Sequence, residues 1–362
     1  MLNLNLFCKD FEFDTIFYIE KGIKNKQIQM KDYKVSGKYP VVDQGKNLIA
    51  GYSNQEDKLY TATPVIVFGD HTRILKYISF PFIVGADGTQ LLKTKVGFSL
   101  RFCFYLLQNT TIENLGYSRH LSVLKEKIFS VPPLPEQEKI AEILGTWDSA
   151  IEKLTALIVA KRLRKKGLMQ KLLTAKIRLP GFTDEWQKVK LGEIASIVKG
   201  EQLGRLEMTE SGIYPVINGG ILKSGFTDSY NREKNTITIS EGGNSCGFVA
   251  FMKERFWCGG HCYALSNLKT DLHFLFQILK FSESNIMRLR VGSGLPNIQK
   301  SSLDNFLLHI PTDISEQKAI ADILSKADEE IDLLTRKLDL LQSQKKGLMQ
   351  QLLTGKIRVN VA

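Results

Sequence analysis

A stretch of 44 residues occurs twice in this chain, and this repeat limits the possible folds more than any other feature. The first copy spans 136–179 and the second spans 316–359, which is 180 positions later without a gap. In all, 22 of the 44 positions are identical, and the longest identical run, Lys-Lys-Gly-Leu-Met-Gln, begins at Lys165 and again at Lys345. A repeat of this length without insertion or deletion predicts that both copies present the same surface over the same length.

Each copy is predicted to form one long helix. Apolar residues recur at alternating steps of four and three, which is the heptad pattern of a coiled coil. A helix over about 140–174 would be roughly 50 Å long at about 1.5 Å per residue. Two such helices most simply bury their apolar seams against each other, although two unrelated amphipathic helices remain an alternative. Lys161 and Lys165 interrupt the first seam, and one hypothesis is that the first helix leaves its partner there for another subunit.

The bulk composition favours a polyanionic partner. The 362 residues leave room for two to three domains, and the net charge is +11. This charge suits nucleic acid but does not distinguish DNA from RNA or an anionic membrane. The five cysteines are odd in number and irregularly spaced, which predicts reduced thiols and a cytoplasmic location. Met1 to Asp10 does not resemble a signal peptide, and no apolar run approaches the length of a membrane span.

The segments before each long helix are predicted to be two related globules. Short apolar runs punctuated by turn formers predict an α+β fold with mostly antiparallel or mixed sheets. Lys21-Gly22 corresponds to Lys199-Gly200, and Tyr39-Pro40-Val41-Val42 corresponds to Tyr214-Pro215-Val216-Ile217, whereas the loops differ. The chain is therefore interpreted as a tandem duplication with four parts, namely a globule at 1–132, a helix at 133–180, a globule at 181–312 and a helix at 313–362.

Three motifs resemble the specificity subunit of type I restriction–modification systems. They are the run Pro133 to Ala141, the Lys-Lys-Gly-Leu-Met-Gln-x-Leu-Leu-Thr-x-Lys-Ile-Arg run from Lys165 and from Lys345, and the segment Pro180 to Ile194. The resemblance covers essentially the full chain. It implies two target recognition domains, related by a pseudo-twofold and separated by an antiparallel coiled coil, that bind a bipartite asymmetric site on double-stranded DNA.

The resemblance also implies partner proteins and no catalysis by this chain. Two methyltransferase subunits and the restriction and translocase subunits would join it, and S-adenosylmethionine, ATP and Mg²⁺ would be bound by those partners. The sequence has neither an Asn-Pro-Pro-aromatic methyltransferase motif nor a phosphate-binding Gly-x-x-x-x-Gly-Lys-Ser/Thr loop. The expected docking surface includes the repeated helix ends, with Lys165, Lys166, Met169, Gln170, Lys345, Lys346, Met349 and Gln350.

Candidate DNA contacts are loop residues that differ between the globules and carry side chains suited to base edges. Arg or Lys suits guanine, and Asn or Gln suits adenine. In the first globule these residues are Lys46, His71, Arg73, Gln90, Arg119 and His120. In the second they are Asn218, Lys223, Asn244, His261, Asn297 and Lys300. For His71 and His120, an ordinary surface loop is an equally weighted alternative to a base or phosphate contact.

A Cys-His cluster could suggest a metal site. Cys258, His261 and Cys262, with Cys246 upstream, offer at most three crowded ligands, and no second pair stands at zinc-finger spacing. Reduced cysteines in a strand, with His261 in a recognition loop, are favoured. The alternatives to a specificity subunit are a stand-alone DNA-binding regulator, a zinc-dependent nuclease, and a purely structural coiled-coil protein.

Overall fold

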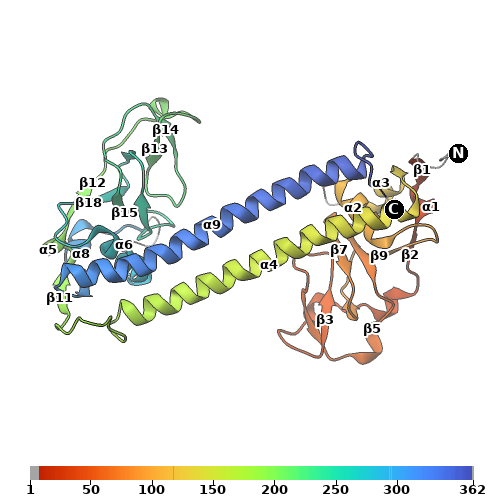
Figure 1. Cartoon of the computed structure of the whole chain (residues 1–362), viewed down its shortest axis with the longest axis horizontal. Coiled ribbons are helices and arrows are strands. Elements are labelled where there is room, and N and C mark those ends of the chain that lie inside the picture. Colours follow the sequence, from red (N-terminus) through yellow and green to blue (C-terminus); the bar gives the residue numbers. More distant parts are fainter. Residues whose placement is uncertain (1–7, 117, 293, 295, 361–362) are drawn as a thin grey trace. The chain divides into compact units, whose positions relative to one another are not determined.

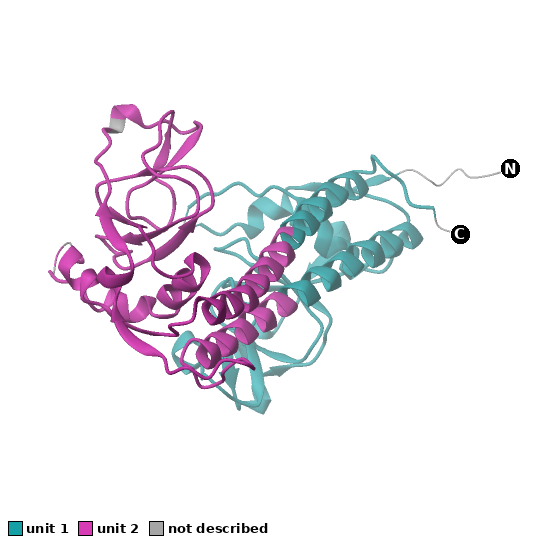
Figure 2. Ribbon diagram, turned by 60° about the vertical axis from the view of Figure 1, so that its left-hand side comes forward, with its two compact units in different colours: residues 1–155, 337–362 teal, residues 156–336 magenta. Residues whose placement is uncertain are grey.

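The computed structural model describes residues 8–116, 118–292, 294 and 296–360. Two long helices, α4 (Leu134–Leu172) and α9 (Ile314–Leu353), dominate it (Figure 1). The chain forms two compact units (Figure 2): the first unit contains residues 1–155 and 337–362, and the second unit contains residues 156–336. Both boundaries fall inside the long helices, so each unit contains a part of each helix. Within the described residues, no helix is long and apolar enough to cross a membrane.

The first unit is built around a four-stranded antiparallel sheet. Its strand order is β2 (Phe17–Ile19), β9 (Thr89–Thr94), β6 (Val65–Gly69), β7 (Leu75–Ile78). All of β6 is buried, as its unbroken apolar sequence predicts for a strand covered on both faces. A second sheet, which contains one parallel pair, has the order β4 (Gly51–Ser53), β3 (Tyr39–Val42), β8 (Phe82–Val84), β5 (Leu59–Tyr60). A separate ribbon pairs β1 (Lys9–Glu12) with β10 (Ile128–Val131).

The second unit repeats this arrangement. Its antiparallel sheet has the order β12 (Ser196–Lys199), β18 (Cys262–Ser266), β15 (Thr236–Ser240), β16 (Val249–Met252). Its smaller sheet, again with a parallel pair, has the order β14 (Gly225–Thr227), β13 (Tyr214–Ile217), β17 (Trp257–Cys258). A ribbon pairs β11 (Gln187–Lys190) with β19 (Leu307–Ile310). The predicted fold class, α+β with mixed and antiparallel sheets on a repeated framework, is confirmed.

A ten-residue helix in each unit is fixed to a long helix by the same glutamine of the repeat. The two helices are α2 (Leu100–Asn109) and α6 (Leu272–Phe281). Their N-caps, Ser99 and Asp271, each accept a hydrogen bond from a backbone N–H of the first turn, as short polar caps do. The backbone N–H groups of these caps donate to Oε1 of Gln137 and of Gln317, both at 2.8 Å. The identity of this position in the two copies therefore has a structural cause.

The hydrophobic core of each unit continues from its sheet into both long helices. Leu144 of α4 and Leu352 of α9 belong to the core of the first unit. Leu172 of α4 and Leu324 of α9, which are the matching positions of the repeat, belong to the core of the second unit. Burying each such side chain contributes about 1.5–3 kcal/mol. Short helices complete the cores, namely α1 (Phe13–Ile16), α3 (Leu121–Lys125), α5 (Leu191–Ile194), α7 (Glu283–Met287) and α8 (Lys300–Asp304).

In the second unit, ion pairs join α4 and the segment that follows it to α9. Nζ of Lys165 lies 2.6 Å from both carboxylate oxygens of Asp328. Farther along the chain, Arg178 donates to Glu316 through Nε at 2.7 Å and Nη2 at 2.8 Å. The Glu316 side chain is only 1% exposed, and it also accepts a hydrogen bond from Nε1 of Trp186 at 3.3 Å. Residue numbers increase from Lys165 to Arg178, whereas those of their partners decrease from Asp328 to Glu316. The two chain segments therefore run antiparallel.

The first unit contains the same two ion pairs with the copies exchanged. Nζ of Lys345 lies 2.5 Å from Oδ1 of Asp148, and Nε of Arg358 lies 2.7 Å from Oε1 of Glu136. Each of these four residues lies 180 positions from its counterpart in the second unit. Each copy of the repeat thus supplies the basic side chain of a pair in one unit and the acidic side chain of the matching pair in the other. This exchange explains why these charged residues are identical in the two copies.

The hypothesis that α4 leaves its partner helix at Lys161 and Lys165 is wrong. Lys165 forms the ion pair described above, and Nζ of Lys161 lies 2.5 Å from Oε1 of Glu330 on α9. Both lysines therefore hold the two helices together. The positions that match Lys161 and Glu330 in the first unit are Leu341 and Ala150, so this third ion pair has no counterpart there.

Glycine is expected to be favoured over alanine at Gly355, just after α9, by its backbone conformation, although the matching Ala175 adopts a similar φ of 57°. Gly355 has φ of 69°, in the left-handed region that costs other residues roughly 1–2 kcal/mol. Alanine also makes the unfolded chain less flexible than glycine does, which offsets about 0.4–1 kcal/mol of this cost. We therefore expect Gly355→Ala to lower the free energy of unfolding by roughly 0.5–1 kcal/mol in urea denaturation.

The control is the same substitution inside α9. Gly347 lies within the helix, and an added Cβ there would meet no atom within 4 Å. Gly347→Ala should raise the free energy of unfolding by roughly 0.8–1 kcal/mol, because glycine is a poor helix former. Effects of the same sign for the two variants would contradict this account of the helix end.

The ion pair at Glu136 is expected to make stability depend on pH. The hydrogen bond from Arg358 lowers the pKa of Glu136 below its ordinary value of 4.5. A lowered pKa in the folded state means that the stabilisation is fully present above pH 4.5 and is lost as pH falls through the folded-state pKa. We therefore expect Glu136→Gln to lower the free energy of unfolding most above pH 4.5, and its difference from wild type to shrink below that pH. Urea denaturation at several pH values measures this difference. Glu138→Gln, at an exposed position two residues away, should show no such trend.

Candidate nucleic-acid interface

Loops from separate strands meet at the same edge of the central sheet in each unit. In the first unit, Asp70 directly follows β6, and its backbone N–H donates to the carbonyl of Gly88, just before β9, at 2.8 Å. In the second unit, Glu241 directly follows β15, and its backbone N–H donates to the carbonyl of His261, just before β18, at 2.9 Å. The sequences that differ most between the globules therefore occupy matching places on a shared framework.

In the first unit this edge borders a cleft of about 980 Å³, and three of the predicted DNA-contacting residues line it: His71, Gln90 and Arg119. The cleft is also lined by cations, by acids and by neutral amides, namely Lys21, Lys24, Arg119, Glu20, Asp70, Asp87, Asn25, Gln27, Gln29 and Gln90. Such a mixture of donors and acceptors is better suited to base edges than a uniformly positive surface, which would fit phosphates alone.

Lys46 lies exposed in the β3–β4 loop of the first unit. A buried lysine anchors this loop, because Nζ of Lys76 donates to the carbonyls of Asp43 at 2.7 Å and Asn47 at 2.6 Å. Burial lowers the pKa of Lys76. The predicted contact Lys46 is therefore presented by a loop that is tied to the sheet.

Two of the predicted contacts in the first unit have structural roles instead. His120 is fully buried; its Nδ1 lies 2.9 Å from the carbonyl of Asp70, and its Nε2 accepts a hydrogen bond from the N–H of Leu115 at 3.2 Å. Neither ring nitrogen is available to DNA, so the prediction is wrong at His120. Nη1 of Arg73 donates to the carbonyl of Ile112 at 2.9 Å, and its backbone φ is 61°. Arg73 thus holds a neighbouring loop in place.

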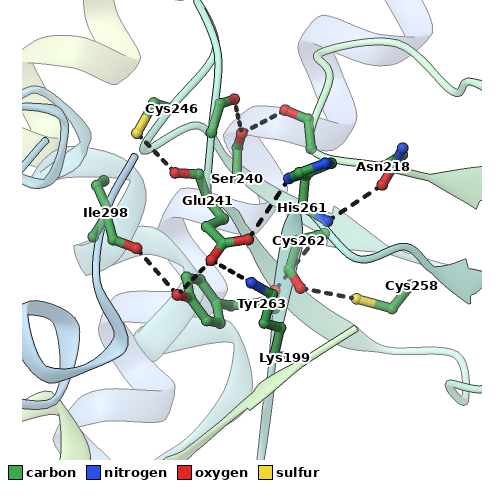
Figure 3. A network of polar contacts seen from close by, with 12 residues as sticks. Lys199, Asn218, Ser240, Glu241, Cys246, Cys258, His261, Cys262, Tyr263 and Ile298 are labelled. Atoms are coloured by element: carbon green, nitrogen blue, oxygen red, sulfur yellow. Dashed lines mark hydrogen bonds and ion pairs between the residues drawn. The ribbon is translucent and has the colours of Figure 1, made fainter. Parts of the chain in front are cut away.

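The matching edge of the second unit carries a polar network centred on the carboxylate of Glu241 (Figure 3). Nζ of Lys199 lies 2.6 Å from Oε1, and the hydroxyl of Tyr263 donates to the same oxygen at 3.1 Å. Burial, together with the neighbouring Glu241, raises the pKa of Tyr263, so the hydroxyl keeps its proton. The imidazole of His261 is exposed, and its backbone N–H donates to Oδ1 of Asn218 at 3.3 Å.

The remaining predicted contacts of the second unit lie on its surface. Lys223 is exposed, with Nζ 4.0 Å from the centroid of the Phe226 ring. Asn244 is exposed in the loop after β15, and Lys300 is exposed at the start of α8. The exposed Asn297 exchanges two backbone hydrogen bonds with Val291, which hold its loop. These residues offer donors to a ligand, but the cluster at Glu241 directly includes only Asn218 and His261 among the predicted contacts.

The cysteines of the second unit are buried. Cys258 ends β17 and Cys262 begins β18, and each is at most 1% exposed. The thiol of Cys258 and burial raise the pKa of Cys262, and burial raises the pKa of Cys246. Among the described residues, no group of three His, Cys, Asp or Glu side chains is placed to hold a metal ion.

Several residues of the two edges were missed by the sequence criteria. A criterion of basic and amide side chains in differing loops does not select Asp70 or Glu241. The occurrence of Lys-Gly in both globules, at Lys21 and Lys199, indicates a framework position for Lys199. That recurrence beside differing loops was the available signal. Gln44, whose Oε1 accepts a hydrogen bond from the N–H of His71 at 3.1 Å, carried no comparable signal.

The predicted docking residues divide into two groups. Lys165 and Lys345 are used in ion pairs, and Met169 and Met349 pack against the cores of the second and first units. The other four are exposed on α4 and α9: Lys166, Gln170, Lys346 and Gln350. The exposed group offers the larger part of a surface for another protein.

The sequence matches the profile of the type I restriction modification DNA specificity domain twice, over residues 9–161 and 183–343. The chain therefore belongs to this family. It is 34% identical over 171 residues to a protein of Mycoplasma genitalium that is provisionally named a type I specificity subunit; the match covers 46% of this chain and 44% of that one. The chain thus spans about half the length of this relative.

Two further comparisons extend over more of the chain. The specificity subunit of the type I restriction enzyme MjaVIII from Methanocaldococcus jannaschii is 26% identical over 268 residues, covering 63% of this chain and 62% of that one. A crystal structure of a type I restriction–modification S subunit from M. genitalium superposes with a TM-score of 0.74 over 100% of this chain and 99% of that chain, at 22% identity. The latter likeness supports the fold.

Proposed function

We propose that this chain is a sequence-specific DNA-binding subunit that directs a type I restriction–modification complex to its site. The observation that carries the proposal is the pair of matching sheet edges, which have one framework and different polar side chains. Two copies of one binding module with different recognition loops suit two different short half-sites, and hence a bipartite asymmetric target. Membership in the specificity-domain family and the net charge of +11 support double-stranded DNA as the ligand.

In this proposal the chain supplies recognition and docking, and partner subunits supply the chemistry. Two methyltransferase subunits would bind equivalent helix surfaces around Lys166 and Gln170 and around Lys346 and Gln350, which are exposed and identical in the two copies. Restriction and translocase subunits would join this complex. S-adenosylmethionine, ATP and Mg²⁺ would be bound by the partners.

The proposal is tested by co-expressing the chain with the methyltransferase subunit of its host in a strain without other DNA methylation. We expect one bipartite motif to be methylated throughout the genome, as found by methylome sequencing, and no methylation when either protein is omitted. Binding of a defined DNA sequence by the chain without any methylation in the presence of the methyltransferase would instead favour a stand-alone DNA-binding regulator.

Replacing Arg119 by alanine is expected to relax one position of the target. Arg119 is exposed at the cleft of the first unit, and an arginine bound to a base edge discriminates by about 1–3 kcal/mol. The preference for the correct base at a single position should therefore fall at least about five-fold. Competition binding with single-base variants of the target measures this preference. A loss of the same size for every sequence would assign Arg119 to a phosphate instead.

A further inference from the structure

An acidic residue stands at the same place in both candidate sites. Asp70 and Glu241 each directly follow the central strand of the antiparallel sheet, where loops of different sequence meet. A carboxylate at the edge of a candidate DNA-binding site repels DNA phosphates, so this position calls for a specific explanation. The two acids differ in how their oxygens are used.

At Asp70, one carboxylate oxygen and the backbone carbonyl are bound by the protein itself. Its Oδ1 accepts a hydrogen bond from the backbone N–H of Leu121 at 2.8 Å, and its backbone carbonyl accepts one from the N–H of His120 at 2.8 Å. Asp70 is 3% exposed. These contacts fix the start of α3, which is a structural role.

The carboxylate of Glu241 differs because one of its oxygens is buried without a hydrogen bond from the described residues. Its Oε1 receives Lys199 and the Tyr263 hydroxyl, as described above, whereas its Oε2 is buried and accepts no hydrogen bond from the described residues. A buried polar atom without a hydrogen bond costs about 1–3 kcal/mol. The imidazole of His261 lies beside this oxygen, with its Nδ1 3.9 Å from Oε2 (Figure 3).

A movement of the His261 side chain can make Oε2 accessible to a ligand. The His261 side chain is 64% exposed, so it can turn aside at little cost and admit a ligand to Oε2. Lys199 offsets the negative charge of the carboxylate and, together with Tyr263, fixes its orientation. An ionised carboxylate has no hydrogen to donate, so its ligand must be a hydrogen-bond donor.

Resting on the function proposed above, we propose that Glu241 determines base identity by accepting a hydrogen bond through Oε2 from the exocyclic amino group of a base in the major groove. Cytosine presents such a group at N4 and adenine at N6, whereas guanine and thymine present acceptors at the same edge. Glu241 would therefore favour cytosine or adenine at one position of the half-site recognised by the second unit.

The test uses the complex of the full chain with the methyltransferase subunit of its host, selecting from a duplex DNA library randomised at every position of the target. For wild type we expect cytosine or adenine at one position that Glu241→Gln alters. The amide of glutamine also donates a hydrogen bond, so this variant should lose roughly ten-fold in preference at that position and accept guanine or thymine more readily. Glu241→Asp should keep the preferred base with weaker selection.

Glu254→Gln is the matched control, because it removes the same charge from an exposed position of the same unit, and it should leave the selected sequence unchanged. Thermal unfolding identifies a misfolded variant, and if Glu241→Gln does not fold, the Glu241→Asp result decides. An equal loss over all sequences, an unaltered selected sequence, or alteration only at a position occupied by guanine or thymine would overturn the role of Glu241. A wild-type complex that selects no defined sequence would overturn the proposed function itself.

Discussion

Replacing Arg178 by alanine is expected to lower the free energy of unfolding by about 3–5 kcal/mol. The substitution removes both hydrogen bonds that Arg178 donates to Glu316. The Glu316 side chain is 1% exposed, so its negative charge would stay buried with Trp186 as its remaining hydrogen-bond donor among the described residues. Removing one member of a buried ion pair is costly because the other charge loses its compensation away from water. Urea denaturation of the full chain measures the change.

Two further variants separate this effect from a general loss of positive charge. Arg162→Ala removes an exposed arginine from α4 in the same unit and should change the free energy of unfolding by no more than about 0.5 kcal/mol. The double variant Arg178→Ala, Glu316→Gln should recover part of the loss, since no buried charge would remain. If Arg178→Ala and Arg162→Ala lower the free energy of unfolding by the same amount, the buried ion pair would not hold the segment after α4 to α9.

Lengthening both long helices by one heptad is expected to lengthen the unread gap of the target by about three base pairs. Seven residues add roughly 10 Å of helix, and DNA rises about 3.4 Å per base pair. One insertion follows Leu157 in α4 and the other follows Thr335 in α9. These positions keep the pair Lys165–Asp328 within one segment and the pair Lys345–Asp148 within the other, so each unit retains its contacts.

The methylated motif of the co-expressed complex provides the readout. Both half-sites should remain the same while the number of undefined bases between them increases. A heptad inserted into α4 alone is the control; it misaligns the repeated ion pairs and should reduce methylation without defining a new motif. An unchanged gap in the doubly lengthened chain would show that the helices do not set the spacing.

The repeat made the long helices and the related globules predictable from sequence. Its heptad pattern and its equal length directly predict two paired helices, and the recurrence of Lys-Gly and of Tyr-Pro-Val predicts a common framework for the sheets. The charged positions of the repeat were harder to interpret. Lys165 interrupts an apolar seam, and its partner Asp328 is 163 residues away, so only the folded chain explains the interruption.

The candidate site was predicted less completely, because the side-chain type of a loop residue does not reveal its burial. His120 is suited to DNA by its chemistry, yet it is enclosed by the carbonyl of Asp70, 50 residues earlier in the chain, and by the N–H of Leu115. Conversely, the charge of Glu241 argues against a DNA contact in sequence, although Lys199 compensates that charge and Tyr263 donates a hydrogen bond to it, both from other strands. Such contacts depend on strand order, which the sequence pattern did not specify.

The exchange of ion-pair partners between the copies has an evolutionary consequence. A single copy of the repeat carries both a lysine and the aspartate that such a lysine contacts, so its surface is complementary to a second identical copy. A primitive chain of half this length could therefore have assembled as a homodimer before its gene was duplicated and fused. The third pair, Lys161 with Glu330, occurs only between unlike copies, because the matching residues are Leu341 and Ala150. An association of two identical copies would therefore lack this contact.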